Sequence, residues 1–146
     1  MTMEKQFDIY KNIVEELIPF NKMLGIRLID ISDGYVLLKV PFRNELVGNP
    51  MVNALHGGLI STAMDTAGGA AGMTTLTSME DRISTIDMRV DYLRPGQAKD
   101  LMVEGHITRS GNRIVATAMV AYHPDEKETP IAEARGVYNV KRNAQA

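Results

Sequence analysis

Residues 54–76 read ALHGGLISTAMDTAGGAAGMTTL, and this stretch decides the fold. It contains five of the chain's twelve glycines and one formal charge, Asp65, which is the only formal charge between Glu45 and Glu80. A helix that is apolar or small on every face belongs in a protein core. The stretch therefore predicts a buried central helix. The carboxylate of Asp65 then needs a partner or a function, because burying an unpaired charge is costly.

The start of this predicted helix is a candidate anion site. His56, Gly57 and Gly58 come directly before the apolar run, and glycine allows other groups to approach the backbone closely. The first N–H groups of a helix have no partner within the helix, and they point at its positive end. Positions 58, 61, 65, 69 and 72 share one helical face and carry Gly, Ser, Asp, Gly and Gly. A ligand could lie against this thin stripe.

Two plainer interpretations of the stretch stay open. Structural hydrogen-bond networks also bury carboxylates, so Asp65 could be a satisfied core residue. A membrane-spanning helix would need about 20 apolar residues, which the length allows. Five glycines, four threonines, His56 and Asp65 make that segment poorly suited to lipid, so the membrane interpretation is the weaker one.

Composition limits the class of protein. The 146 residues are enough for a single domain, 1–146, and 45% of them are hydrophobic. The net charge of −2, without a run of Lys and Arg, excludes nucleic-acid binding by bulk electrostatics. The absence of cysteine excludes disulfides, a thiolate nucleophile and cysteine metal sites. The first ten residues carry no apolar signal-peptide core, so we expect a cytoplasmic protein that does not associate with membranes.

The rest of the chain predicts one helix and about six strands. Residues 4–18 show apolar side chains at helical spacing and end before Pro19, which predicts an amphipathic helix within 1–20. Residues 26–31 and 35–42 predict two strands joined at Asp33–Gly34, followed by a loop over 43–55. Further strands are predicted over 86–92, 101–107, 114–122 and 131–140, with a frayed tail at 141–146. Of these, 114–122 is apolar on both faces and should be central.

This order predicts an α+β fold in which one antiparallel sheet wraps around the central helix. Strands that follow one another through short turns favour antiparallel pairing. A helix that is apolar all round must be covered on more than one side, and a curled sheet provides that cover.

The motifs within this framework resemble those of the hotdog-fold acyl-CoA thioesterases of the PaaI-like, phenylacetate-pathway branch. The resemblance covers residues 20–140. The residues that carry it are Gly48-Asn49-Pro50, Ala54-Leu55-His56-Gly57-Gly58, Asp65-Thr66-Ala67-Gly68-Gly69, Thr85-Ile86-Asp87-Met88 and Tyr92-Leu93-Arg94-Pro95-Gly96. It implies a hotdog fold, a homodimer or homotetramer with active sites at the dimer interface, and hydrolysis of acyl-CoA to a free acid and coenzyme A. It implies no metal, and no cofactor other than the coenzyme A that is part of the substrate.

The resemblance also implies roles for individual residues. Asp65 would act as general base or nucleophile, and the Gly57 N–H would bind the thioester oxygen. In the family this His shapes the loop and contacts the thioester rather than acting as the base. For His56 a direct catalytic role stays open, as does a plain bond to backbone at the helix entry. The family's polar residue lies six positions before this His, where the chain has Pro50, so Asn49 becomes the candidate. Thr85 would hold the attacking water from the facing subunit, although simple strand alternation turns it away from Met88 unless a bulge intervenes.

Substrate binding adds four more candidates. Gly58 lies at the helix start, and Arg94, Asn112 and Arg113 lie at two turns where cations and backbone N–H groups could meet the phosphates of coenzyme A. Small residues around Asp65, with Met51, Met64, Met73 and Met88 nearby in the sequence, permit an aliphatic or an aryl acyl group. A medium or long aliphatic chain is preferred, because Met adapts to flexible apolar ligands.

Two other functions on the same fold stay open. A non-catalytic acyl-CoA-binding protein would need an output module, and residues 1–20 supply only one helix without a basic face. A hotdog hydratase or dehydratase would use a His base in a differently patterned loop. An acidic residue within the helix that follows His-Gly-Gly favours hydrolysis.

Overall fold

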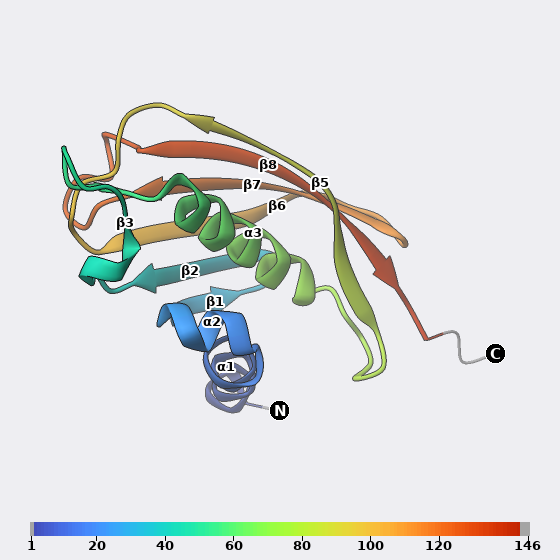
Figure 1. Ribbon diagram of the computed structural model, residues 1–146. Coiled ribbons are helices and arrows are strands. Elements are labelled where there is room, and N and C mark those ends of the chain that lie inside the picture. The colour runs from blue at the N-terminus through green and yellow to red at the C-terminus, as the bar shows by residue number, and fades with distance from the viewer. Residues whose placement is uncertain (1, 144–146) are drawn as a thin grey trace.

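A six-stranded antiparallel sheet curls around one long helix, α3 (Gly57–Met73), as Figure 1 shows. The computed structural model describes residues 2–143. The strand order is β1-β2-β6-β7-β8-β5, and α3 contacts every strand of the sheet from β2 to β5. The predicted α+β fold with a wrapped central helix is therefore confirmed.

The N-terminal segment forms two helices where the sequence predicted one. α1 (Met3–Asn12) continues into η1 (Ile13–Leu17), a π-helical turn, and α2 (Pro19–Leu24) follows. Pro19 ends the first helix as predicted, since Ile18 before it is extended. The same proline then occupies the first turn of α2, where its missing N–H costs nothing. Pro19 therefore both ends the first helix and starts the second, and the apolar spacing of residues 4–18 predicts only the first of these roles.

The first hairpin is confirmed, whereas the predicted loop after it contains short elements. β1 (Arg27–Ser32) and β2 (Tyr35–Val40) pair across a turn in which Gly34 has a φ of 73°. The loop over 43–55 holds the 3-10 turn η2 (Asn44–Leu46) and a small antiparallel ribbon of β3 (Val47–Asn49) and β4 (Ala54–Leu55). This ribbon sets the direction in which the chain enters α3.

The remaining strands are β5 (Arg82–Tyr92), β6 (Leu101–Ser110), β7 (Ile114–Tyr122) and β8 (Ala132–Lys141). β7 lies between β6 and β8, so the predicted central strand is confirmed. β5 begins at Arg82, four residues before the predicted start at 86. A bulge between Thr85 and Asp87 interrupts its alternation, which hides the first part of the strand from a periodicity test.

The bulge also corrects the predicted faces of β5. Ile86 was expected beside Met88, but its side chain is 56% exposed, while Met88 packs against the core. Thr85 and Met88 therefore face the central helix together. A bulge was the condition under which Thr85 could share a face with Met88, and the bulge is present.

Small residues bring α3 unusually close to the sheet. A Cβ atom at Gly105 on β6 would lie 2.6 Å from the Ala67 carbonyl oxygen, and one at Gly68 would overlap the Tyr138 hydroxyl oxygen. Alanines 63, 67 and 71 of α3 are fully buried in the same layer. The glycines in the sequence therefore serve helix–sheet packing as well as the helix start.

The predicted frayed tail is wrong for its first three residues. Lys141 belongs to β8, Arg142 donates to the Thr75 and Asn112 carbonyl oxygens, and the Asn143 N–H donates to Asp81. Residues 144–146 lie outside the described residues. Within residues 2–143, no helix has both the length and the apolarity needed to cross a bilayer.

Candidate active site

The central helix begins with a histidine cap. His56 is extended (φ −64°, ψ 128°), and its Nδ1 accepts a hydrogen bond of 2.8 Å from the Gly58 N–H. An accepting Nδ1 places the proton of a neutral ring on Nε2. The side chain is exposed, so His56 satisfies one free backbone donor of the helix start without being buried.

Gly57 keeps its own N–H available. Among the hydrogen bonds of residues 2–143, none uses the Gly57 N–H as donor, while the next three N–H groups all bond to His56. The Gly57 carbonyl accepts from the Tyr92 hydroxyl at 3.0 Å, which ties the helix start to the end of β5. Of the two predicted glycine donors, Gly57 is therefore open to a ligand, and Gly58 is occupied by His56.

Asp65 lies half-buried at the middle of α3, where two hydroxyl groups hold its carboxylate. Thr85 Oγ1 donates to Asp65 Oδ1 at 2.8 Å, and the Tyr138 hydroxyl donates to the same oxygen at 3.1 Å. No donor within residues 2–143 reaches Asp65 Oδ2. This Thr85 contact lies within one chain, and a role of Thr85 toward a facing subunit stays a prediction.

Tyr138 is the residue that the sequence analysis missed. It is 1% exposed, and its hydroxyl also meets the Asp65 carbonyl oxygen at 3.0 Å. Burial raises the pKa of Tyr138 above its ordinary value, and the nearby charge of Asp65 adds to the rise. The hydroxyl therefore stays protonated as a donor to Asp65. Alternation along β8 places Tyr138 on the helix-facing side with Ala134 and Gly136, and that signal could have identified it.

A groove of about 510 Å³ opens beside Asp65. From α3 it is lined by side chains of one helical face, and from β5 by three consecutive residues before the bulge. The N-terminal segment forms the remaining wall. The lining residues are Ile13, Val14, Ile18, Phe20, Asn21, Thr62, Asp65, Thr66, Gly69, Ala70, Met73, Ile83, Ser84, Thr85 and Tyr138.

The groove overlaps the predicted ligand face of α3 in part. Asp65 and Gly69 of the predicted stripe line it, whereas Gly58, Ser61 and Gly72 do not. Gly72 instead packs against Ile83, where an added Cβ would overlap that side chain. The remaining α3 residues of the groove, Thr62, Thr66, Ala70 and Met73, each lie one position after a residue of the stripe.

Asn49 lies on the short ribbon that precedes the helix. Its side chain is exposed, and its Oδ1 accepts from the Met51 N–H at 3.1 Å within the turn. The neighbouring Gly48 packs on His56, where a Cβ would lie 2.5 Å from the His56 Cα. The ribbon therefore places Asn49 near the helix start, with its amide oxygen already committed to the turn.

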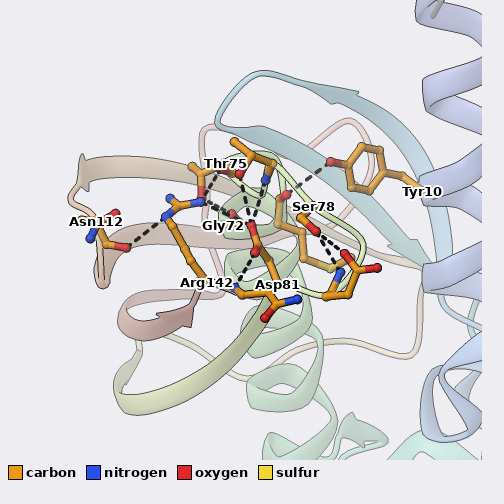
Figure 2. Close-up of polar contacts among 11 residues, drawn as sticks. Tyr10, Gly72, Thr75, Ser78, Asp81, Asn112 and Arg142 are labelled. Atoms are coloured by element: carbon orange, nitrogen blue, oxygen red, sulfur yellow. Dashed lines mark hydrogen bonds and ion pairs between the residues drawn. The ribbon is translucent and has the colours of Figure 1, made fainter. Parts of the chain in front are cut away.

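The predicted phosphate ligands lie at opposite ends of the fold. Arg94 is exposed, and Nη1 of its guanidinium donates to the Pro130 carbonyl oxygen. Two residues later, the Gly96 carbonyl oxygen accepts from the Leu55 N–H, which places Arg94 near the helix start. Asn112 lies beyond the C-terminal end of α3, where Arg142 joins its carbonyl oxygen to that of Thr75 (Figure 2). One chain does not bring these two groups together.

Asn112 and Arg113 border a separate depression of about 370 Å³. Lys141 and Arg142 line it as well, so three cationic side chains gather there. The Arg113 side chain is exposed, while its carbonyl oxygen accepts from the Val140 N–H at 2.7 Å.

A family model described as the thioesterase superfamily matches residues 53–129, which is more than half of the chain. The chain belongs to the thioesterase superfamily. Over 152 aligned residues it is 34% identical to the medium/long-chain acyl-CoA thioesterase YigI of Escherichia coli strain K12, covering 96% of this chain and 97% of that protein. The family inferred from the sequence motifs is confirmed.

Solved structures confirm the hotdog architecture of this thioesterase-superfamily chain. A Shewanella oneidensis protein related to the thioesterase superfamily superposes with a TM-score of 0.83 at 30% identity, covering 94% of this chain and 97% of that one. The PaaI protein of the E. coli phenylacetic acid degradation operon superposes with a TM-score of 0.80 at 19% identity, covering 94% and 95%. At that identity the likeness to PaaI shows the fold alone.

The thioesterase-superfamily match contains part of the site and omits part. Residues 53–129 include His56, Gly57, Asp65 and Thr85. Tyr138 and the N-terminal wall of the groove lie outside the matched range. The groove is therefore lined partly by residues within the matched range and partly by residues outside it, which the fold places beside them.

Proposed function

We propose that this chain hydrolyses acyl-CoA thioesters to a free acid and coenzyme A, with Asp65 as the base. The observation that carries the proposal is the Asp65 carboxylate in an otherwise mostly apolar groove. Thr85 and Tyr138 both donate to Oδ1, which fixes the carboxylate and leaves Oδ2 to accept a proton. The relative YigI is named a medium/long-chain acyl-CoA thioesterase, which agrees with this substrate class.

In the proposed reaction, Asp65 Oδ2 takes a proton from water as the water oxygen attacks the thioester carbonyl carbon. The carbonyl oxygen becomes an oxyanion, which a backbone N–H such as that of Gly57 would stabilise. Collapse of the intermediate breaks the carbon–sulfur bond, and the proton held by Asp65 passes to the leaving thiolate. Direct attack by Asp65 through a covalent anhydride is the alternative chemistry of the same carboxylate.

A second copy of the chain would complete this site. Gly57 precedes Asp65 by eight helical positions, or about 12 Å along the axis at 1.5 Å per residue. One thioester cannot touch both groups of one chain at that separation. β5 is an edge strand of eleven residues, and the exposed Ile86 and Tyr92 lie on it. Pairing of two β5 edges would join the sheets of a homodimer and bring Gly57 of one copy toward Asp65 of the other.

The phosphates of coenzyme A would then meet cations from either end of the fold. Arg94 lies near the helix start, and Arg113 lies with Lys141 beyond the opposite end, where the Arg142 guanidinium is already held by the Thr75 and Asn112 carbonyl oxygens. In a dimer these ends can face one another across the interface, which a single chain does not allow. His56 and Asn49 would position the entry loop beside the thioester, and neither would take the proton of the attacking water.

The deciding experiment measures thiol release from a series of acyl-CoAs by wild type and by Asp65→Asn. We expect release by wild type and a loss of about 100-fold or more in the variant, since a positioned base contributes about 10² to 10⁴. Asn keeps the acceptor oxygen for Thr85 and Tyr138, so the fold should persist. Asp87→Asn is the matched control, because Asp87 is an exposed carboxylate two residues after Thr85.

Each alternative has its own outcome in this experiment. Full activity of Asp65→Asn would show that another group is the base. Tight acyl-CoA binding without thiol release would favour a binding protein. Consumption of an enoyl-CoA without thiol release would favour a hydratase.

A further inference from the structure

The N-terminal wall of the groove is held in an unusual backbone form. Residues 13–17 adopt a π-helical turn, a rare conformation that often occurs at functional sites. Glu15 within it is only 6% exposed. Its carboxylate accepts from the Leu28 N–H at 2.9 Å and from Lys11 Nζ at 2.6 Å, and it pairs with Arg27 at 3.6 Å. These contacts anchor the turn to β1 and leave Ile13 and Val14 to line the groove.

Two polar contacts fix this wall along α3. The Tyr10 hydroxyl donates to the Met73 carbonyl oxygen at 3.2 Å, at the C-terminal end of the helix (Figure 2). Thr66 Oγ1 donates to Asn21 Oδ1 at 3.4 Å, one residue after Asp65. The wall therefore runs antiparallel to α3, with Ile18 closer to Asp65 and Ile13 closer to Met73.

The groove has one charged group, Asp65, which lies with the hydroxyl groups of Thr85 and Tyr138. The other polar residues of the lining are uncharged: Asn21, Thr62, Thr66 and Ser84. Beyond Asp65 the α3 side of the groove continues through Gly69 and Ala70 to Met73. Opposite lie the isoleucines at positions 13, 18 and 83. A ligand with one reactive polar group and an unbranched hydrocarbon tail matches this distribution.

The length of the groove gives the length of the tail. Met73 lies eight helical positions beyond Asp65, or about 12 Å at 1.5 Å per residue. A zigzag of carbon–carbon bonds of about 1.5 Å advances about 1.25 Å per carbon, so about nine or ten carbons span that distance. The volume of about 510 Å³ also lies within the usual range of small-molecule sites, about 300–1,000 Å³.

We propose that residues 13–21 measure the acyl chain, so that octanoyl to dodecanoyl thioesters are the preferred substrates. Ile13 limits the far end and Ile18 limits the middle of the tail. This inference rests on the proposed thioester hydrolysis and adds to it the substrate class and the residues that select it.

The test compares kcat/KM for butanoyl-, hexanoyl-, octanoyl-, decanoyl-, dodecanoyl- and hexadecanoyl-CoA between wild type and two variants that fill the groove. Ile13→Trp should lower kcat/KM for dodecanoyl-CoA by about tenfold, because the larger side chain excludes about two methylenes of the tail. The change in kcat/KM should be smallest for butanoyl-CoA. Ile18→Trp should move the optimum to still shorter chains, because it lies closer to Asp65. Leu17→Trp is the control, since Leu17 lies in the same turn, is 63% exposed and does not line the groove.

A third variant guards against misfolding of the tryptophan variants. Ile13→Ala cannot overfill the site, and it should extend the accepted chain toward hexadecanoyl-CoA. Chain-length profiles that stay unchanged in Ile13→Trp, Ile18→Trp and Ile13→Ala, as in Leu17→Trp, would overturn the assignment.

A binding measurement separates this inference from the proposed function. Titration calorimetry with decanoate and butanoate needs no catalysis. If wild type releases no thiol from any acyl-CoA, the proposed function fails. Weaker decanoate binding by Ile18→Trp than by Leu17→Trp would then still support the chain-length role of residues 13–21. Equal decanoate binding by those two variants would overturn it.

Discussion

The two ends of the central helix treat their free backbone groups in opposite ways. At the start of α3, the Gly57 N–H has no acceptor within residues 2–143, and the Gly58 N–H is capped only by the exposed His56. At the other end, the carbonyl oxygens of Ala71 and Gly72 each accept from a backbone N–H and from a threonine hydroxyl. Every helix leaves about four such groups at each end. At the C-terminal end the carbonyl oxygens of Ala71, Gly72 and Met73 all have partners outside the regular helix pattern, whereas the Gly57 N–H at the start has none within residues 2–143.

The C-terminal end gains further support from distant segments. The Met73 carbonyl oxygen accepts from Tyr10, and the Thr75 carbonyl oxygen accepts from Arg142 at 3.3 Å. Asp81 collects the Thr77 and Asn143 N–H groups and pairs with Arg142 at 3.5 Å, as Figure 2 shows. The C-terminal end of α3 therefore contributes to stability, whereas the N-terminal end leaves a backbone donor for a ligand.

The largest expected effect is the loss of the free donor at the helix start. Gly57→Pro removes the N–H but suits the first helical position, and His56 already has the extended backbone that a following proline requires. We expect thioester hydrolysis to fall by about 100- to 1000-fold, the usual cost of losing an oxyanion donor. The measurement is kcat/KM for decanoyl-CoA, together with circular dichroism.

Gly57→Ala is the matched control. It adds the same Cβ, which lies 3.4 Å from the Tyr92 ring, but keeps the N–H. If the proline and alanine variants hydrolyse decanoyl-CoA at rates within about threefold of each other, the Gly57 N–H is not the oxyanion donor.

A smaller effect is expected at the closed end, and on stability rather than activity. Arg142→Met removes the donors to the Thr75 and Asn112 carbonyl oxygens while keeping the apolar stem. Because such hydrogen bonds contribute about 1 kcal/mol each, the free energy of unfolding should fall by about 1–2 kcal/mol. Urea unfolding measures the change. A decanoyl-CoA turnover that falls as steeply as the stability would argue that the two ends are not separate in function.

Much of this molecule could be predicted from local sequence. The charge-poor run at 54–76, the turn at Asp33–Gly34 and the run at 114–122 that is apolar on both faces each depend on neighbouring residues, and each prediction is confirmed. Family motifs added His56, Gly57, Asp65 and Thr85, whose geometry the structure provides and whose roles stay predictions.

The missing parts depend on contacts between distant segments. Tyr138 reaches Asp65 from 73 positions away, and Asn21 reaches Thr66 from 45. Alternation along β8 assigns Tyr138 to the helix-facing side, but no periodicity signals which residue it contacts there. The bulge at Ile86 is local, but it inverts the faces of β5 and so defeats an alternation test at the position where Thr85 turns inward.

The smallest expected effect is a change with pH in the stability contribution of Asp81 at the closed end. The change is confined to acidic solution. The backbone N–H of Asn143, with that of Thr77, holds the pKa of Asp81 below its ordinary value of 3.8. A carboxyl group with a lowered folded pKa stabilises the fold above its unfolded pKa. That contribution is lost as the pH falls from about 3.8 through the lowered value.

Asp81→Asn should therefore be less stable than wild type at pH 6, and the difference should shrink below pH 4. Thermal unfolding across this range measures it, with the exposed Asp87→Asn as the control. If the difference between wild type and Asp81→Asn is constant with pH, the stability of this end comes from the shape of the side chain rather than from its charge.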